Sequence, residues 1–565
     1  MGMATGSDTL PGRVTVVLDS LDDEQRAAAV LPDGPAQVLA PAGSGKTATL
    51  VARIGVLISA GVPAARILVV TFNRDAAAEL GRRISSRLGL VPRNDGPEVR
   101  TLHALARQIV LDAGAPARLV ADRLPILRSA RRQVAATLPA DAHLPPAEEL
   151  DSAVSTAILE GRQHPHPVSD VVEAYRRLLA IRGATDFDLL LSDALAILHR
   201  DAARRSRWQG RFRHILVDEF QDVDATQVEL VGLLAEPERN LFVVGDDDQT
   251  IYAWRLADVR RILEFPVRYP DARRIILETN YRCPPAVVAA ADRLIATNRE
   301  RVPKRLRAAA TPRGDRVVPI MSWALRGPDA IDELAAALPG WAAQAGRLAV
   351  LTRTRAELAP LALALLRGDV PHTTSIPTPL EAESVHALLG DLGADPSAAP
   401  LPALLAARAR RGWRRGDEND RIGEDDHAAL DAAIGWAVGH RRTDSYLAAF
   451  ADAKARLASL RVPDAAIELA TVHGAKGREW PTVVVLGMEV DRFPNRRAVV
   501  EAIDPVRAVE EERRLAYVAV TRCRRNLVLA YDPDRASPFV AELMGRSDSA
   551  RSPVYRPTSG AAVSR

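Results

Sequence analysis

The stretch Ala40-Pro41-Ala42-Gly43-Ser44-Gly45-Lys46-Thr47 decides the fold of this chain. It follows the apolar pair Val38-Leu39 and precedes apolar residues at helical spacing, which are Leu50, Ile54, Leu57 and Ile58. A strand, a tight glycine loop and a helix in this order are typical of a phosphate-binding loop. The strict pattern has Gly where this chain has Ala40, and the alternative is a chance turn before a helix. We interpret the stretch as a nucleoside triphosphate site.

The chemistry of this loop follows from its backbone and from two side chains. Gly43 and Gly45 let the backbone curl so that N–H groups converge, and the helix N-terminus adds partial positive charge. Lys46 is expected to reach the β- and γ-phosphates, and the Thr47 hydroxyl is expected to be a ligand of Mg2+. The full set of predicted nucleotide contacts in this region is Ala42, Gly43, Ser44, Gly45, Lys46, Thr47 and Thr49.

A second acidic element lies further along the chain. The apolar strand pattern His214-Ile215-Leu216-Val217 is followed at once by Asp218 and Glu219. Two carboxylates at the end of a buried strand suit a nucleotide hydrolase, in which Asp218 would hold Mg2+ and Glu219 would polarise the attacking water. The alternative is a polar turn. The phosphate-binding loop upstream favours the hydrolase.

Bulk properties limit the class of protein. A chain of 565 residues is too long for one core and suggests roughly three or four domains. The net charge of +3 permits nucleic-acid binding without requiring it. No apolar run is as long as the about 18 residues that a membrane-spanning helix needs, and the N-terminus lacks a secretory signal. Cys283 and Cys523 lie far apart, which excludes a cysteine-only zinc cluster and fits a reducing, cytoplasmic location.

The order of apolar and polar segments predicts an α/β fold with two similar halves of parallel sheet and flanking helices. We expect each half to carry a helical insertion, at residues 104–185 and 396–464. The first half then covers 19–103 and 186–283, and the second covers 284–395 and 465–535. Residues 1–18 are interpreted as a loose leader and residues 536–565 as a flexible tail.

Aromatic residues near Gln249 stand out because aromatics are only 4% of the chain. Tyr252 and Trp254 beside Arg255 suit stacking of nucleic-acid bases, which is worth ~1–3 kcal/mol per base. For Tyr252, a place in the core is an equally good interpretation. The basic cluster Arg408–Arg415 could contact phosphates, but a solvated helix face is the favoured interpretation.

The motifs taken together resemble a known family. In chain order they are Gln25, Ala40–Thr47, Val70–Leu80, Thr101–His103, Val217–Asp222, Val243–Arg255, Leu277–Arg282, Thr471–Trp480 and Glu511–Arg524. Each motif alone is widespread, but this ordered set is specific, and it resembles superfamily 1A DNA helicases of the UvrD/Rep/PcrA group. The resemblance covers about residues 19 to 535. It implies two RecA-like domains, 1A and 2A, with ATP between them and with helical domains 1B and 2B inserted.

The resemblance also implies roles for individual residues at the nucleotide. Gln25 would read the adenine, Tyr281 would stack on it, and Glu479 would contact the ribose. Gln249 would sense the γ-phosphate. Arg282 and Arg522 would bind the γ-phosphate, where guanidinium groups stabilise the charge that develops during phosphoryl transfer.

For DNA, the resemblance implies contacts through Phe72, His103, Tyr252, Trp254, Arg255, His473 and Lys476. A motor that moves on any sequence should grip by stacking and backbone charge. The implied activity is 3′→5′ translocation on single-stranded DNA and unwinding of forked or tailed DNA, in repair or replication. A repair protein is the implied partner, and no membrane is involved.

Departures from the family keep other functions open. Arg478 and Trp480 stand where the group usually has Leu and Phe, domain 2B is reduced to residues 396–464, and no nuclease domain is expected. With a small 2B, the chain could instead be a DNA-stimulated ATPase that translocates or strips proteins without unwinding duplex unaided. A non-catalytic ATP-binding scaffold is a weaker alternative, because each residue that the chemistry needs is present.

Overall fold

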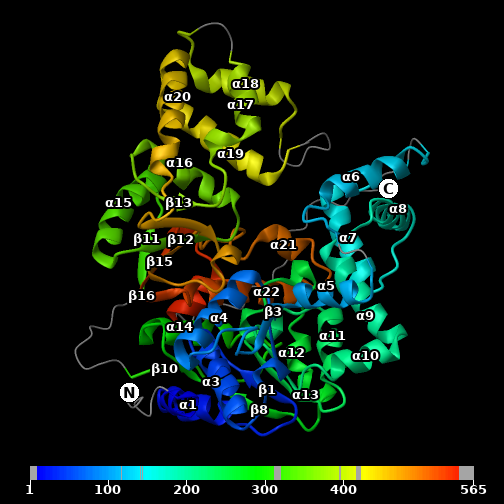
Figure 1. Cartoon of the computed structure of the whole chain (residues 1–565). Coiled ribbons are helices and arrows are strands. Elements are labelled where there is room, and N and C mark those ends of the chain that lie inside the picture. The colour runs from blue at the N-terminus through cyan, green and yellow to red at the C-terminus, as the bar shows by residue number, and fades with distance from the viewer. Residues whose placement is uncertain are drawn as a thin grey trace, which may run out of the picture. The chain divides into compact units, whose positions relative to one another are not determined.

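The computed structural model describes residues 9–115, 118–139, 142, 144–310, 320–392, 396–414 and 422–545. The chain divides into two compact units. The first unit runs to Asn280 and includes Glu300–Arg305, and the second consists of Tyr281–Arg299 and the chain from Leu306 onward. In the described residues each unit contains a six-stranded parallel sheet with helices around it (Figure 1). The predicted α/β class with two parallel sheets is confirmed.

The first sheet has the strand order β3-β2-β6-β7-β1-β8. Its strands are β1 (Ala36–Leu39), β2 (Ile67–Thr71), β3 (Glu98–Thr101), β6 (His214–Val217), β7 (Leu241–Gly245) and β8 (Arg273–Ile276). Apolar runs such as Ile67–Thr71 form its inner strands because both faces of a parallel sheet are covered. In the parallel register, Leu39 lies beside Gly245 and Val217 beside Val243. The loops that follow β1, β6 and β7 therefore leave the sheet at the same edge.

Helices cover both faces of this sheet. One core joins its strands to α1 (Leu10–Asp19), α2 (Asp23–Ala29), α3 (Lys46–Ser59) and α4 (Arg74–Leu88). The other joins them to α5 (Leu102–Asp112), α9 (Phe187–Arg200), α10 (Ala202–Gln209), α11 (Ala225–Ala235), α12 (Arg260–Leu263) and α13 (Phe265–Arg268). The site-bearing edge of the sheet is thus held by two packed layers.

The N-terminal segment differs from its prediction. Residues 10–18 are not a loose leader, because they belong to α1, which Thr9 caps. Val14 and Val17 on one face of α1 are buried in the same core as α3 and α4. The short apolar stripe is stabilised by this packing, and a local reading of the sequence underestimated it. The remainder of the predicted leader, residues 1–8, lies outside the described residues.

The first helical insertion has a core of its own, formed by α6 (Leu124–Ala135), α7 (Ala147–Leu159) and α8 (Val168–Ile181). The short strands β4 (Arg118–Leu119) and β5 (Ala184–Thr185) pair beside it. The predicted start at residue 104 is too early, because Leu105 and Ile109 of α5 are buried in the core of the sheet. A helix that continues directly from a strand gives no sequence signal for this boundary.

The second sheet has the order β11-β16-β15-β12-β14-β13. Its strands are β11 (Met321–Ala324), β12 (Leu348–Thr352), β13 (Thr373–Thr374), β14 (Ile467–Thr471), β15 (Trp480–Leu486) and β16 (Cys523–Tyr531). The four inner strands are mostly buried apolar runs, as expected for a parallel sheet covered on both faces. The edge strands β11 and β13 were not predicted, since β13 is very short and β11 exposes most of its side chains. Two further short strands are β9 (Thr279–Asn280) in the first unit and β10 (Arg307–Ala308) in the second.

The helices of the second unit fall into two groups. The first group accompanies the sheet and consists of α14 (Pro285–Ile295), α15 (Ala330–Ala345), α16 (Ala359–Arg367), α21 (Arg496–Val500), α22 (Pro505–Val520) and α23 (Pro538–Met544). The second group has a separate core and consists of α17 (Glu383–Gly390), α18 (Pro400–Arg410), α19 (Glu424–Ala437) and α20 (Thr443–Leu460). That core also takes Leu363 and Leu366 from α16, so it begins before the predicted residue 396.

The predicted tail also contains ordered structure. Residues 538–544 form α23, whose Phe539 is fully buried with the Arg513 guanidinium 5.2 Å from its ring centroid. Arg513 also donates to Glu542 at 2.8 Å. The prediction of a flexible tail is therefore wrong for this helix, because long-range packing outweighs its Ser/Pro/Arg-rich surroundings. Residues 546–565 lie outside the described residues.

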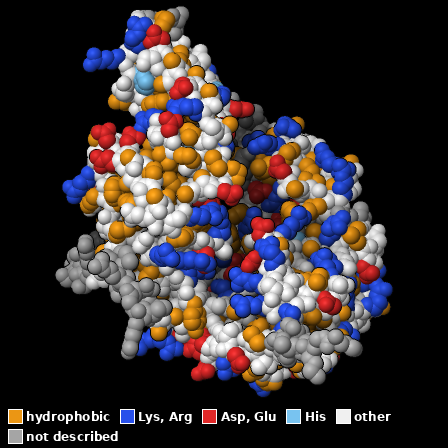
Figure 2. Space-filling model, turned by 60° about the vertical axis from the view of Figure 1, so that its left-hand side comes forward, with side chains coloured by type: hydrophobic (Ala, Val, Ile, Leu, Met, Phe, Trp, Pro, Cys, Tyr) orange, Lys and Arg blue, Asp and Glu red, His pale blue; other side chains and the backbone are white. Residues whose placement is uncertain are grey.

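Arg408 and Arg411 of the predicted basic cluster contact residues of the second helical insertion itself, whereas Arg415 lies outside the described residues. Arg408 donates to Asp431 at 2.6 Å and to the Trp413 carbonyl at 3.0 Å. Arg411 pairs with Asp391, and its guanidinium lies 4.9 Å from the Trp413 ring centroid. These contacts agree with the favoured interpretation of a helix surface. More generally, Lys and Arg side chains are interspersed with Asp and Glu over the face of the molecule shown in Figure 2.

Candidate nucleotide and DNA sites

The phosphate-binding loop joins β1 to α3 at the carboxyl edge of the first sheet. Gly45 is the residue before α3, with a left-handed φ of 81° and no side-chain cap on the helix. Helix N–H groups without a side-chain cap are suited to bind an anion. The positive φ favours glycine at this position, and a Cβ atom at Gly45 would also displace the side-chain amide of Gln25.

Three long-range hydrogen bonds fix the loop. Gln25 Nε2 donates to the Ser44 carbonyl at 2.8 Å, and Asn280 Nδ2 donates to the Ala42 carbonyl at 2.7 Å. The N–H of Ala40 donates to the Gly245 carbonyl at 2.8 Å. This is a backbone hydrogen bond, so Ala in place of the usual Gly at position 40 does not prevent it. Sequence reasoning missed Asn280, although its position directly before the predicted site residue Tyr281 was a usable signal.

The two carboxylates after β6 face the loop lysine. Lys46 Nζ lies 3.9 Å from Glu219 Oε2. Burial, together with repulsion from Glu219, raises the pKa of Asp218 to about 7. A divalent cation would relieve this repulsion, and the Asp218 carboxylate and the Thr47 hydroxyl are the oxygen ligands that Mg2+ prefers. The Ser44 hydroxyl is buried without a hydrogen-bond partner among the described residues, as expected where a polar ligand completes the site. The residues therefore fit Mg2+ with a bound phosphate.

Glu219 is held in an unusual conformation. Its φ of 55° and ψ of 44° place a non-glycine residue in the left-handed region, a conformation that costs on the order of 1–3 kcal/mol and clusters at functional sites. Gln221 Nε2 donates to Glu219 Oε2 at 2.5 Å and so orients the carboxylate. The strained turn and this hydrogen bond together aim the Glu219 side chain beside Lys46.

The same Gln221 continues a hydrogen-bond network to the next strand. Its Oε1 accepts from the N–H of Asp246 at 2.9 Å, directly after β7. Gln249 Nε2 in turn donates to Asp246 Oδ2 at 2.6 Å. A Cβ at Gly245 would lie 2.6 Å from Gln221 Oε1, so glycine permits this close approach. Glu219 and Gln249 are thus connected through Gln221 and Asp246, two residues that sequence reasoning did not select.

The side chain of Thr49, a predicted nucleotide contact, is hydrogen-bonded within its own helix. The Thr49 side chain is fully buried, and its hydroxyl donates to the Gly45 carbonyl at 3.3 Å. The structure therefore uses this hydroxyl inside the first turn of α3. Its role in nucleotide binding stays a prediction.

In the second unit, Glu479 lies beside one other predicted nucleotide residue, Arg282. Arg282 and Arg524 both form ion pairs with this carboxylate, and although burial opposes it, they hold the pKa of Glu479 below its usual value. Arg282 also donates to the Thr521 carbonyl at 3.3 Å. Arg522 is buried, with Nε donating to the Val518 carbonyl at 3.0 Å.

Tyr281 begins the second unit, directly before Arg282, and is 52% exposed. His473 and Lys476 follow β14, in and just after the short helix η7 (His473–Ala475), and both are half-buried. The structure therefore brings Arg282 and Glu479 together and places Tyr281 beside them in the chain.

The two departures from the family pattern form one cluster. Arg478 pairs with Glu468, and its guanidinium lies 4.8 Å from the Trp480 ring centroid. Trp480 Nε1 donates to Glu468 Oε2 at 3.0 Å. The indole N–H of Trp480 needs a hydrogen-bond acceptor, which a Phe side chain would not need, and Glu468 is that acceptor. Arg478 balances the negative charge of Glu468. The two substitutions therefore compensate one another.

An aromatic row marks the predicted DNA site of the first unit. Phe72 and Tyr252 stack with ring centroids 5.1 Å apart and planes 13° apart. Trp254 meets Tyr252 edge-on at 6.2 Å and is 61% exposed, with the Arg255 guanidinium 4.6 Å from its ring centroid. Tyr252 is half-buried and so is not a fully buried core residue, and its role in base stacking stays a prediction. Rings of this kind suit base stacking.

A cavity of about 630 Å³ adjoins the row. Phe72 and His103 line it together with four arginines, which are Arg74, Arg93, Arg100 and Arg107. Burial, with a contribution from Arg255, lowers the pKa of His103 to about 4, so its ring is neutral at pH 7. The arginines were not predicted as site residues, because they come from separate segments, and their charge suits a phosphate backbone.

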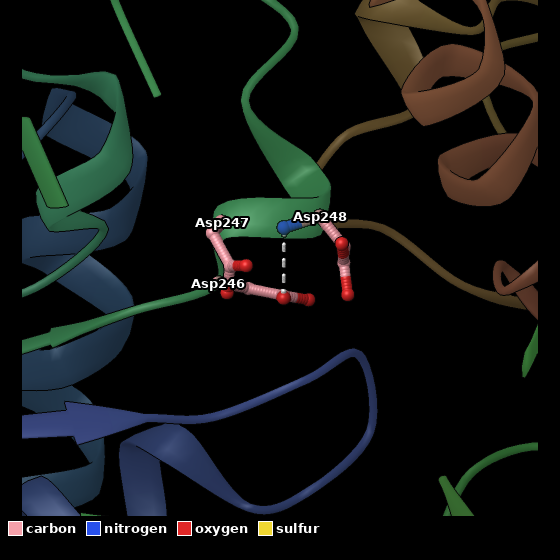
Figure 3. Close-up of side chains that lie close together, drawn as sticks. All are labelled: Asp246, Asp247 and Asp248. Carbon is pink, nitrogen blue, oxygen red and sulfur yellow. Dashed lines mark hydrogen bonds between the residues drawn. The ribbon is translucent and has the colours of Figure 1, made fainter. Parts of the chain in front are cut away.

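Three adjacent carboxylates follow β7. Oxygens of Asp246, Asp247 and Asp248 lie within 4.8 Å of one another (Figure 3). This geometry alone would suit a cation, but the Lys304 ammonium already lies 2.5 Å from Asp247 and 2.7 Å from Asp248. The chain therefore neutralises this cluster with its own side chain. The residues that fit Mg2+ are Asp218 and Thr47.

The fold and site define a P-loop nucleotide hydrolase built on two parallel-sheet units, with a surface of aromatic and basic side chains on the first. Family comparison agrees: residues 21–270 match the UvrD/REP helicase N-terminal domain, and residues 448–533 match the UvrD-like helicase C-terminal domain. The chain belongs to the UvrD-like superfamily 1 helicases and is an ATP-dependent DNA helicase. Among the described residues, no helix is long and apolar enough to cross a membrane.

Individual relatives support the same conclusion. The chain is 30% identical to ATP-dependent DNA helicase UvrD2 of Mycobacterium tuberculosis, over 92% of this chain and 80% of the relative. It is 29% identical to UvrD1 of the same organism, over 92% and 83%. It is also 29% identical to DNA helicase II of Escherichia coli K12, over 92% and 86%.

Proposed function

We propose that this helicase hydrolyses ATP with Mg2+ at the phosphate-binding loop of the first unit and moves 3′→5′ on single-stranded DNA. The observation that carries the proposal is the network from Lys46 and Glu219 through Gln221 and Asp246 to Gln249. It connects the residues of phosphate chemistry to the turn that leads into Tyr252 and Trp254. A motor needs such a connection between hydrolysis and DNA.

In this proposal each nucleotide residue has one task. The loop N–H groups and Lys46 bind the phosphates, and Thr47 and Asp218 hold Mg2+, which supplies charge neutralisation at the phosphates when bound. Glu219 takes the proton of the attacking water, a role supported by its fixed carboxylate and its position beside Lys46. Gln249 responds to the γ-phosphate.

The remaining nucleotide roles rest on the family pattern. Gln25 reads the adenine edge, Tyr281 stacks on the base and Glu479 binds the ribose. Arg282 and Arg522 bind the γ-phosphate. The position of Gln25 against the loop supports the first role. The ion pair of Arg282 with Glu479 supports a shared task for these two residues.

DNA binding is proposed along the aromatic row. Bases stack on Phe72, Tyr252 and Trp254, while Arg255 and the arginines of the adjoining cavity hold phosphates. His103, His473 and Lys476 complete the predicted contacts. We assign the two parallel-sheet units to the RecA-like domains 1A and 2A and their helical insertions to 1B and 2B, with the insertion bounds as corrected by the structure. We also propose a role in DNA repair or replication, a repair-protein partner and a cytoplasmic location.

Strand displacement tests direction and unwinding together. Duplexes with a 3′ tail, a 5′ tail or no tail are incubated with the protein, ATP and Mg2+, and the released strand is measured. The proposal predicts release from the 3′-tailed duplex alone. Release from the 5′-tailed duplex would contradict the polarity. Displacement of streptavidin from end-biotinylated single strands, without any duplex unwinding, would instead support the translocase that strips proteins.

A further inference from the structure

Lys304 is a fully buried lysine among three carboxylates of the first unit. Its Nζ lies 2.5 Å from Asp247, 2.7 Å from Asp248 and 3.6 Å from Asp246. Burial alone would lower the pKa of Lys304, but the three carboxylates raise it above the ordinary lysine value. The Lys304 side chain is therefore charged. Removing charges from water is costly unless they are paired. Lys304 supplies that pairing.

The residues next to Lys304 bind the same turn. Arg301 forms two hydrogen bonds with the Asp248 carboxylate, at 3.0 and 2.9 Å. The N–H of Val302 donates to Asp247 Oδ2 at 2.7 Å. Three positions of the segment Glu300–Arg305, here called the strap, therefore hold the turn Asp246–Asp248 shown in Figure 3.

The turn that the strap holds carries the connection between nucleotide and DNA residues. Asp246 accepts from the Gln249 side chain and donates its N–H to Gln221, which binds Glu219. The chain continues from Gln249 to the stacking residue Tyr252 within three positions. A shift of the turn would therefore move both ends of this connection.

The chain on either side of the strap belongs to the second unit. Before the strap, the N–H of Arg299 donates to Glu510 at 2.8 Å, and after it, the N–H of Leu306 donates to Asp292 at 3.2 Å. Both of these acceptors also belong to the second unit. The strap is thus tied to the second unit at both ends and to the turn in its middle.

We propose that Lys304 is a positioning residue that couples the nucleotide site to the DNA site by holding the Asp246–Asp248 turn on the strap. The inference rests on the proposed function. In it, nucleotide at Gln249 changes the affinity of the Tyr252–Trp254 segment for DNA only while Lys304 fixes the turn between them. Such a coupling is reciprocal, so it is measurable as a change of DNA affinity on nucleotide binding.

The test measures this coupling in the full chain. Fluorescence anisotropy of a fluorescein-labelled oligo-dT gives the Kd for DNA without nucleotide and with saturating AMP-PNP and Mg2+. The ratio of the two Kd values is the coupling factor, and couplings of this kind are typically about 5–150-fold. The variants are Lys304→Met, which removes the ammonium, and Lys304→Arg, which keeps the charge.

For wild type we expect a coupling factor clearly different from one, and for Lys304→Met a factor within about twofold of one. The far-UV circular dichroism of Lys304→Met should match that of wild type, and the Kd values for DNA alone and for AMP-PNP alone should each remain measurable, which a general loss of structure would not allow. Lys304→Arg should restore much of the factor. A coupling factor of Lys304→Met equal to that of wild type would overturn the proposal.

Two further variants keep the test decisive. If Lys304→Met does not fold, Arg301→Gln removes the two hydrogen bonds to Asp248, keeps Lys304 and should still lower the factor. An unchanged factor there contradicts the proposal. Arg305→Gln is the matched control, because Arg305 is an exposed residue of the strap that lies outside the carboxylate cluster. A loss of the coupling factor in Arg305→Gln as large as in Lys304→Met would also contradict the role of Lys304. A wild-type protein that fails to bind DNA would refute the proposed function itself.

Discussion

Replacing Trp254 by alanine should weaken DNA binding without disturbing the fold. The ring is 61% exposed and contacts Tyr252 edge-on and Arg255 through its face, so its removal opens no core cavity. Changes at such positions usually alter stability by no more than about 0.5 kcal/mol. Loss of one base stack costs ~1–3 kcal/mol. Because about 1.4 kcal/mol corresponds to a factor of ten, DNA affinity should fall about 5- to 140-fold.

The assay is ATP hydrolysis titrated with oligo-dT. For Trp254→Ala, the DNA concentration at half-maximal stimulation should rise by that factor, and DNA-stimulated hydrolysis should fall more than hydrolysis without DNA. Trp254→Phe keeps a ring and should lose much less. Val267→Ala, at a position 78% exposed in the same unit, is the matched surface control and should respond to DNA as wild type does. Equal loss of stimulated and unstimulated hydrolysis in Trp254→Ala would refute its role in stacking.

Three other predictions concern the first unit. Lys46→Ala should abolish ATP hydrolysis, measured as phosphate release, because no other side chain is proposed to reach the β- and γ-phosphates. Gly45→Ala should weaken ATP binding at least about tenfold in a fluorescent-nucleotide titration, since its Cβ would displace Gln25. Gly61→Ala has a similar positive φ of 90° but open space around it, so it should lose stability and keep ATP binding. Burial lowers the pKa of His214 from its ordinary 6.5 to about 4. Between these pH values His214 binds a proton in the unfolded chain but not in the folded chain. Stability should therefore fall as pH drops from 6.5 to 4, and the urea midpoint of His214→Gln should depend less on pH in that window; an equal dependence would contradict this origin.

Local signals explain what could be predicted from the sequence. The glycine loop before Lys46 carries its structure in adjacent residues and lies where predicted, between a strand and a helix. The carboxylates after Val217 likewise lie where predicted, because the end of a buried strand fixes their position. Motifs of this kind are short, so sequence alone was sufficient to identify the family.

Long-range contacts explain what was missed. Asn280 and Lys304 act on segments far from them in sequence. No local pattern distinguishes Lys304 from a surface residue, and the one local signal for Asn280 is its position directly before Tyr281. Cys283 and Cys523 lie far apart in sequence, yet both are buried in the second unit, where interaction with Cys283 and burial raise the pKa of the Cys523 thiol. Helix α23 is stabilised by the contacts of Phe539.

The central claim is that hydrolysis at Glu219 is coupled to single-stranded DNA. The most direct measurement is the rate of phosphate release with and without oligo-dT, for wild type beside Glu219→Gln. The account predicts strong stimulation by DNA in wild type and almost no hydrolysis by the variant under either condition, since the amide is isosteric but cannot accept the proton. Hydrolysis in wild type that is indifferent to DNA, or a Glu219→Gln variant that remains fully active, would contradict the account.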